Sequence, residues 1–318
     1  MFRFIASKTR LAAWVCCLAS VACTGLAQDQ SHLPDCDHDR CQGRVNLPLA
    51  TLGGRQVWSD VSWDQDWRVQ RHIWTGHCRL LDPRGIRRAW GSREDCERRL
   101  ACVRSGFEEP GPEHLVVLLH GLGRTRWSLT GLADELEMSG MATACLSYPS
   151  MRGSIEEHAD DLERLLLGLR GVRRVSFVTH SLGGIVVREL LDREQLWADL
   201  ELQRVVMIAP PNQGAQLSSR LQGNLLFDWI GGPAGGQIGT GQPSERAIPM
   251  VPTLVVAGTG PGASGYNPLI DGDDDGIVGV HETALAGAER LLVRGLHTNL
   301  MNQQAVRAGV LEFLKPVR

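Results

Sequence analysis

The serine with the clearest chemical setting in this sequence is Ser181. It follows an uninterrupted apolar segment, 175–179, and precedes Leu182-Gly183-Gly184 and an amphipathic segment. This pattern predicts a buried strand that passes directly into a helix, with the serine at the turn between them. A hydroxyl at such a turn projects from the carboxyl end of the strand, and glycines let the two backbones approach closely. The segment therefore predicts a nucleophilic serine.

This strand-turn-helix resembles the nucleophile elbow of the α/β-hydrolase family. Thr179 departs from the family's usual first glycine and requires a slightly wider approach of the backbones. The resemblance covers about residues 113–318, and the segments 209–214 and 267–270 are also similar to exported bacterial lipase-like hydrolases. Triacylglycerol lipases and palmitoyl thioesterases are the most similar members. The resemblance implies an α/β fold, with a mostly parallel sheet and helices on both faces.

An earlier apolar segment, 115–119, ends in His120-Gly121-Leu122-Gly123, which is similar to the family's H-G-x-G oxyanion loop. The resemblance implies that the backbone N–H groups of Leu122 and Leu182 form the oxyanion hole. Such preorganised donors typically contribute about 3–4 kcal/mol to acyl transfer. We expect His120 to orient this loop and not to act as the base.

The resemblance also implies the acid and the base of a catalytic triad. Asp275 lies after a predicted strand, in an Asp-Gly-Ile-Val run, where similar lipases and esterases carry the triad aspartate. His297 follows the final predicted strand, at the position of the family's general base. The order Ser181, Asp275, His297 is the family's order. His281 is an alternative base, but it precedes the final strand.

The acidic segment around Asp275 has a second interpretation. It matches the twelve-residue EF-hand calcium loop at Asp271, Asp273, Asp275, Gly276 and Glu282. The glycines and prolines of 260–268 exclude the helix that should enter an EF-hand. A calcium loop without helices stays an alternative, and it would compete for Asp275. We expect no metal and no organic cofactor for the triad reaction.

From residue 113 onward, apolar segments alternate with amphipathic ones, which indicates βαβ units around a buried parallel sheet. The expected strands are 115–119, 142–147, 175–179, 205–209, 253–257 and 291–293, and the expected helices are 129–138, 155–169 and 182–191. Residues 211–250 are inserted between two strands. Their apolar cluster, 225–230, and glycine-rich stretch, 231–241, predict either a lid that binds an acyl chain or an ordinary packed helix and loop.

Residues 28–112 differ in character, because they hold five of the nine tryptophans. Two strands, 55–63 and 67–81, are expected to form a hairpin at one edge of the sheet, followed by a short helix at 95–103. We expect the tryptophans to be core residues. The alternative is a platform that stacks on carbohydrate.

The first residues have the pattern of a secretory signal peptide. A positive start is followed by an uncharged apolar run, 11–23, and cleavage is expected after Ala27, so residues 1–27 are removed. Lipoprotein processing at Cys23 is the less favoured alternative. The protein is therefore expected to be exported, either to the periplasm or to the medium.

Cysteine usage fits an oxidising compartment. Of the nine cysteines, six follow the predicted cleavage site, and five of these precede residue 103. An even number in an exported protein predicts disulfides, which would mostly staple the N-terminal segment. Cys36 and Cys41 are not spaced as a zinc site, so we expect disulfide bonding there and no metal.

Composition limits the function further. The chain has 318 residues, 43% hydrophobic and 22% charged, with a formal net charge of −3. This balance argues against a protein whose main partner is nucleic acid. We expect a serine hydrolase that cleaves small-molecule or lipid carboxylic esters through an acyl-enzyme on Ser181, with transient lipid-surface contact as one option. A thioesterase, an amidase or peptidase, an acyltransferase and a non-catalytic envelope-binding protein are the alternatives.

Overall fold

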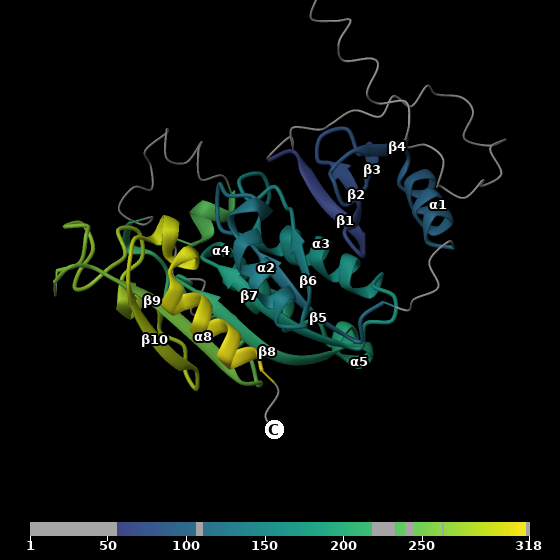
Figure 1. Cartoon of the computed structure of the whole chain (residues 1–318). Helices are drawn as coiled ribbons and strands as arrows, with labels where there is room; N and C mark the ends of the chain where they lie inside the picture. The colour runs from purple at the N-terminus through teal and green to yellow at the C-terminus, as the bar shows by residue number, and fades with distance from the viewer. Residues whose placement is uncertain (1–55, 106–110, 218–232, 239–244, 263, 316–318) are drawn as a thin grey trace, which may run out of the picture.

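The central feature of the fold is a parallel sheet. The computed structural model describes residues 56–105, 111–217, 233–238, 245–262 and 264–315. Within them, six strands pair in the order β10-β9-β8-β7-β5-β6, and every neighbouring pair is parallel (Figure 1). The strands are β5 (His114–Leu119), β6 (Ala142–Leu146), β7 (Arg174–His180), β8 (Glu201–Ile208), β9 (Thr253–Thr259) and β10 (Glu289–Arg294).

Helices cover both faces of this sheet, which explains why its strands are apolar on both sides. Successive residues of β5 pack in opposite cores, because successive side chains of a strand point to opposite faces of the sheet. Leu115 and Val117 pack with α3 (Ile155–Leu167), α4 (Leu182–Leu190) and α5 (Glu194–Asp199). Val116 and Leu118 pack with α2 (Thr130–Met138) and α8 (Gln304–Leu314).

The predicted alternation of strands and helices is thus confirmed, with differences at particular elements. β8 begins at Glu201, four residues before the expected start, because its polar first half already pairs with β7. The helices α5 and α8 were not predicted.

The N-terminal region forms a second sheet of its own. Four antiparallel strands lie in chain order: β1 (Trp58–Asp64), β2 (Trp67–His72), β3 (Cys78–Leu81) and β4 (Arg87–Gly91). The helix α1 (Arg93–Arg104) packs on this sheet, and a small core forms between them from Val61, Val69, Cys78, Leu80, Cys96 and Leu100. Ser92 begins α1 with a capping box.

Two expectations for this region are corrected. The segment 67–81 is not one strand, because a turn between β2 and β3 contains Gly76 at φ +66°. The hairpin is also not an edge of the parallel sheet, since β1 and β2 belong to the separate four-stranded sheet. The two sheets meet where the Asp60 N–H donates to the Ser147 oxygen, 2.9 Å away, just beyond β6.

The predicted role of the tryptophans is only partly met. Trp63 is buried, at 8% exposure, and packs with the core of the parallel sheet. Trp58, Trp67 and Trp90 are half-buried, and Trp74 is 67% exposed.

The described cysteines also correct an expectation. Cys78 and Cys145 are buried free thiols, so the prediction of disulfides is wrong for these two. Cys102, in α1, is disulfide-bonded, but no disulfide joins two residues of the described ranges. Cys36, Cys41 and the predicted signal peptide lie outside those ranges.

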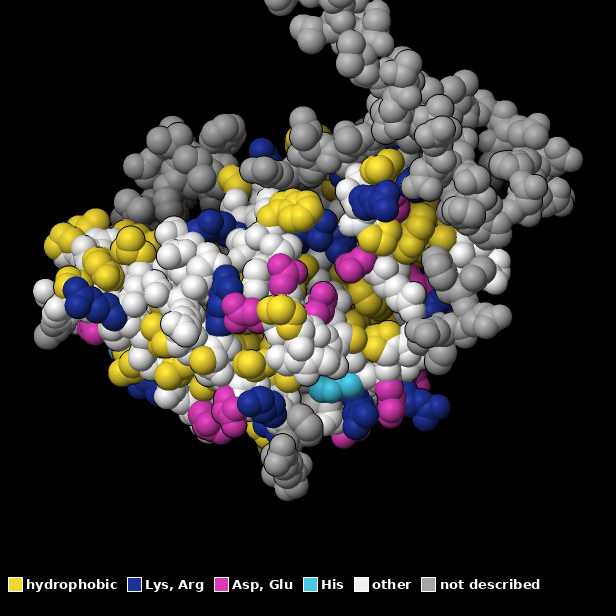
Figure 2. Space-filling model, in the orientation of Figure 1, with side chains coloured by type: hydrophobic (Ala, Val, Ile, Leu, Met, Phe, Trp, Pro, Cys, Tyr) yellow, Lys and Arg dark blue, Asp and Glu magenta, His cyan; other side chains and the backbone are white. Residues whose placement is uncertain are grey.

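The next two observations concern membrane-spanning helices and the charged side chains of the surface. No helix among the described residues is long and apolar enough to span a membrane. On the face shown in Figure 2, basic and acidic side chains are interspersed, in keeping with the small net charge of −3.

Candidate active site

Ser181 lies at a sharp turn between β7 and α4. Its backbone has φ 52° and ψ −121°, a conformation that a residue with a side chain adopts only under local constraint. The Ser181 N–H donates to the Ile208 oxygen at 2.8 Å, which ties the turn to β8. Ser181 is buried, with 9% of its surface exposed.

Close packing explains the glycines after this serine. A Cβ on Gly183 would lie 2.7 Å from the Leu119 oxygen and 3.0 Å from the His120 oxygen. Thr179, which replaces the usual first glycine, is fully buried, and its hydroxyl donates to the Val206 oxygen at 3.1 Å. The threonine is tolerated because its polar atom is bonded across the sheet.

Asp275 and His297 meet at the carboxyl ends of β9 and β10. His297 begins a 3₁₀ helix, His297–Asn302, and its Nδ1 lies 2.8 Å from Asp275 Oδ2. The other carboxylate oxygen, Oδ1, accepts the N–H groups of Ile277 (3.0 Å) and Val278 (2.8 Å). Because a carboxylate accepts, Nδ1 carries the hydrogen, so Nε2 is the nitrogen that presents a lone pair when the ring is neutral. Both side chains are buried, with Asp275 at 1% and His297 at 6% exposure.

The Asp275–His297 pair lies close to Ser181, because His297 contacts His180, the residue directly before the serine. The rings of His180 and His297 have centroids 4.7 Å apart. No hydrogen bond joins the Ser181 hydroxyl to the His297 ring within the ranges that the structure describes. Such bonds are often long without substrate and tighten in the complex.

The loop after β5 lies against the nucleophile. A Cβ on Gly121 would be 3.0 Å from Ser181 Cβ. The Leu182 N–H belongs to the first turn of α4, where helices leave N–H groups without an internal acceptor. The Leu122 N–H donates to no backbone oxygen of the described residues. The Leu182 N–H thus directly follows the serine in the chain, and the Leu122 N–H directly follows the glycine that contacts it.

His120 holds this loop in place. Its Nδ1–H donates to the Gly121 oxygen at 2.9 Å, and its own carbonyl accepts the Tyr148 hydroxyl at 2.6 Å. The Tyr148 ring stacks on the imidazole, with centroids 4.4 Å apart. Burial lowers the pKa of His120 to about 4, so the ring is neutral at pH 7.

The carboxylates of the acidic loop bind separate parts of the backbone. Asp273 accepts the Gly260 N–H at 2.7 Å, and Glu282 accepts the Gly279 N–H at 2.6 Å. Asp275 faces His297, as described above. No group of three metal-binding side chains occurs in the described part of the chain. The side chains of the calcium alternative therefore do not converge on one point.

One structural residue of this loop was missed from the sequence. Asp274 is fully buried, and its Oδ1 accepts the N–H groups of Asn267 (3.0 Å) and Gly276 (2.6 Å). A Cβ on Gly265 would overlap this carboxylate. The only signal in the sequence is that Asp274 lies between two other aspartates, in a segment rich in glycine.

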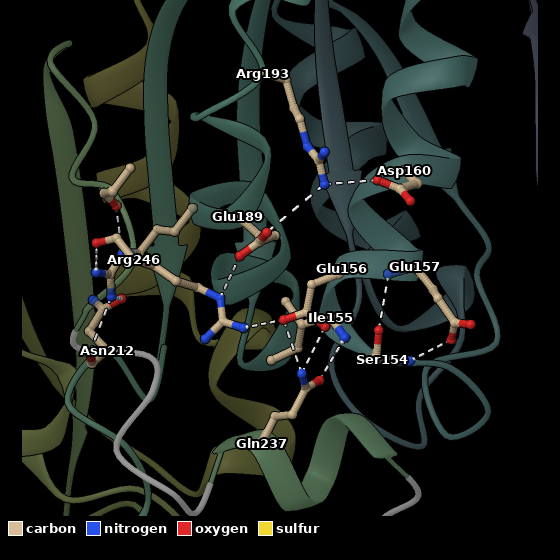
Figure 3. A network of polar contacts seen from close by, with 12 residues as sticks. Ser154, Ile155, Glu156, Glu157, Asp160, Glu189, Arg193, Asn212, Gln237 and Arg246 are labelled. Atoms are coloured by element: carbon tan, nitrogen blue, oxygen red, sulfur yellow. Dashed lines mark hydrogen bonds and ion pairs between the residues drawn. The ribbon is translucent and has the colours of Figure 1, made fainter.

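Parts of the predicted lid region, 211–250, are fixed to the helices of the core. Arg246, only 7% exposed on its side chain, forms ion pairs with Glu189 of α4 and Glu156 of α3, both at 2.9 Å (Figure 3). Gln237 accepts the Ile155 N–H at 2.8 Å and donates to Glu156. These two residues therefore fix the described part of the region to α3 and α4, whereas Met250 at its end is exposed. The apolar cluster 225–230 lies outside the described residues.

Arg188 anchors the same region from within α4. It is 1% exposed, and it donates to the backbone oxygens of Ala247 (2.9 Å) and Asn212 (3.1 Å). Burial lowers the pKa of its guanidinium to about 10, which still leaves it charged at pH 7. Asn212 in turn donates to the Thr283 oxygen at 3.0 Å. Both ends of the inserted region are thus tied to the helix that follows Ser181.

Comparison with known proteins gives the family to which this fold belongs. Residues 116–300 match the family described as "Alpha/beta hydrolase family", and the chain belongs to this family. A comparison with curated proteins found no match.

Two solved structures show the same fold. The Bacillus licheniformis lipase BlEst2 in its mature form is 22% identical, with a TM-score of 0.51, over 64% of this chain and 94% of that chain. Its propeptide form is 20% identical, with a TM-score of 0.52, over 66% of this chain and 52% of that chain. At this identity the likeness concerns the fold.

Proposed function

We propose that this protein is a serine hydrolase that cleaves carboxylic esters through an acyl-enzyme on Ser181. The observation that carries the proposal is the 2.8 Å contact between His297 Nδ1 and Asp275 Oδ2, beside the strained turn of Ser181. A carboxylate that accepts a hydrogen bond from Nδ1–H leaves Nε2 as the base, which is the arrangement that activates a serine hydroxyl.

In the proposed mechanism, His297 Nε2 takes the Ser181 proton as the hydroxyl oxygen attacks the ester carbonyl. Asp275 keeps the imidazole in the required tautomer and stabilises its positive charge. The N–H groups of Leu122 and Leu182 bind the oxyanion of the tetrahedral intermediate. The alcohol leaves with the proton from His297. Water then attacks the acyl-enzyme with His297 again acting as the base, and the acid is released.

The proposed substrates are small-molecule or lipid esters. The site lies at the carboxyl ends of the parallel strands, where ligands bind in open α/β sheets. Leu122, which carries one proposed oxyanion donor, lies near the helical segment 233–238, since a Cβ on Gly235 would be 3.5 Å from Leu122 Cδ2. The helical segment 233–238 therefore borders the proposed acyl site.

The proposal is tested by hydrolysis of p-nitrophenyl butyrate by the wild type and Ser181→Ala. We expect the variant to lose about 10³-fold or more of kcat, because no other group then forms the acyl-enzyme. Ser139→Ala, which removes an exposed hydroxyl at the end of α2, is the matched control and should keep full activity. Ser181→Ala activity within about tenfold of the wild type would exclude Ser181 as the nucleophile.

A further inference from the structure

A second histidine at this site has no part in the reaction proposed above. His180 is the last residue of β7 and directly precedes Ser181. It is 1% exposed and packs between the loop that carries Gly121 and the ring of His297. A buried polar ring next to a nucleophile requires an explanation, because an apolar side chain would fill the same space at lower cost.

The hydrogen bonding of His180 defines its state. Its Nε2 lies 3.1 Å from the backbone oxygen of His297. A carbonyl oxygen only accepts, so Nε2 carries the hydrogen and donates it. Burial, and then the nearby His297, lower the pKa of His180 well below its usual value. The ring is therefore neutral at pH 7 and keeps this donor.

The other ring nitrogen has no such partner. Nδ1 of His180 is buried and forms no hydrogen bond with any described residue. A Cβ on Gly121 would lie 2.8 Å from it, so the backbone of the oxyanion loop closes this side of the ring. An unpaired buried acceptor destabilises the folded protein. The hydrogen bond from Nε2 is thus the one polar interaction that accounts for a histidine here.

The backbone of His297 is held on both of its polar groups. Its backbone N–H donates to the backbone oxygen of Asp275 at 2.8 Å, and its backbone oxygen accepts from Nε2–H of His180. The first bond ties the base to the loop of the acid. The second ties the base to the strand that carries the nucleophile.

We propose that His180 is a positioning residue that fixes the distance between His297 and Ser181. This inference rests on the proposed function. Asp275 sets the orientation and tautomer of the base, and His180 sets where the base stands relative to the hydroxyl. Because the His180 ring is neutral, it adds no repulsion to the imidazolium that forms on His297.

Two amide variants separate this role from simple packing. Glutamine places an N–H near the position of imidazole Nε2, whereas the shorter asparagine places it near Nδ1, toward Gly121. We expect His180→Asn to lower kcat for p-nitrophenyl butyrate about 10- to 100-fold at similar KM, since a misplacement of about 1 Å has effects of this size. His180→Gln should stay within about fivefold of the wild type.

One control variant and one replacement variant accompany these two substitutions. His114→Asn removes a histidine that contacts Ser176 at 2.9 Å near the amino ends of β5 and β7, and it should keep full kcat. If His180→Asn does not fold, His180→Phe supplies a variant without a donor and is expected to lose kcat in the same way. Equal kcat in a folded variant without the Nε2 donor and in His180→Gln would overturn the inference.

A measurement on the wild-type protein separates this inference from the proposed function. ¹⁵N NMR of the imidazoles is expected to show His180 as a neutral Nε2–H tautomer at pH 7, whether or not a substrate is known. An Nδ1–H tautomer or a charged ring overturns the positioning role. Activity that survives Ser181→Ala would instead overturn the proposed function.

Discussion

At the scale of single residues, Asp275 is the group with the most closely defined task. Oδ1 is held by two backbone N–H groups, and only Oδ2 is directed at His297. The carboxylate therefore cannot rotate without losing bonds, and the imidazole takes its orientation from a fixed partner. This is the arrangement expected of a group that selects a tautomer rather than one that shares a proton.

Asp275→Asn tests this task. The amide can present an N–H to Nδ1 where the carboxylate presents an acceptor, and this favours the tautomer with the hydrogen on Nε2. We therefore expect kcat to fall about 10²- to 10⁴-fold with the fold retained. Steady-state kinetics with p-nitrophenyl butyrate and a thermal melt measure the two effects. Asp271→Asn, on an exposed residue of the same loop, is the control. A variant Asp275→Asn with near wild-type kcat contradicts the role of the carboxylate.

Residue patterns predicted part of this site and missed the rest for a physical reason. Ser181 and its glycines form a local signal, because the turn itself requires those residue types. Asp275 and His297 were expected from family resemblance, and the structure brings their side chains into contact. The contact from His180 to the His297 oxygen joins residues 117 positions apart, and no local pattern reports it.

At the scale of elements, the approach of α4 to β5 determines where the Leu182 N–H points. Gly183 packs on the backbone oxygens at the end of β5, with no room for a methyl group. The same approach gives the serine its positive φ. The packing of a strand against a helix thus places the nucleophile and one proposed oxyanion donor together.

Gly183→Ala tests this packing. Its Cβ would lie 2.7 Å from the Leu119 oxygen, so α4 must shift, and we expect a loss of about 1–3 kcal/mol in the free energy of unfolding. Activity should fall as well, because Leu182 moves with the helix. Gly236→Ala adds a methyl group in open space and serves as the control. Urea denaturation measures both, and equal midpoints for the two variants would contradict the packing argument.

Elements of the parallel sheet were predictable because strands covered on both faces are apolar throughout. The break between β2 and β3 was missed because β-branched and aromatic residues, Ile73 and Trp74, continue through the turn. Gly76, at φ +66°, was the available signal. The hydrophobic pattern of the sequence therefore located the strands of the parallel sheet better than the turns of the N-terminal sheet.

At the scale of the whole molecule, the two sheets are joined by the packing of Trp63 in the core of the parallel sheet and by polar contacts. The Asp60 N–H donates to the Ser147 backbone oxygen, and the Asp60 carboxylate accepts the Ser147 N–H, although the two residues are 87 positions apart in sequence. Asp161 of α3 accepts Arg71 of β2 at 3.0 Å. Neither contact could be read from local sequence, which explains why the N-terminal strands were assigned to the wrong sheet.

Buried histidines also predict how the molecule responds to acid. Burial lowers the pKa of His158 and of His120 to about 4, while an unfolded histidine titrates near 6.5. Between these values the unfolded state binds more protons, so stability falls as the pH drops from about 6.5 toward 4. Each residue contributes up to about 1.4 kcal/mol per pH unit in this window.

His158→Gln should therefore flatten this dependence. Between pH 6.5 and 5, we expect the variant to lose about 1.6 kcal/mol less than the wild type in the free energy of unfolding. Urea titrations at several pH values measure the difference. His281→Gln removes an exposed imidazole and should follow the wild type. Parallel curves for His158→Gln and the wild type would contradict the burial argument.

Covalent labelling with a fluorophosphonate, followed by peptide mass spectrometry, tests whether Ser181 is an activated nucleophile. We expect one adduct on Ser181, lost in Ser181→Ala and formed much more slowly in Asp275→Asn, because the hydroxyl is activated only through His297. An adduct on another residue, or no adduct on folded protein at pH 7–8, would contradict it.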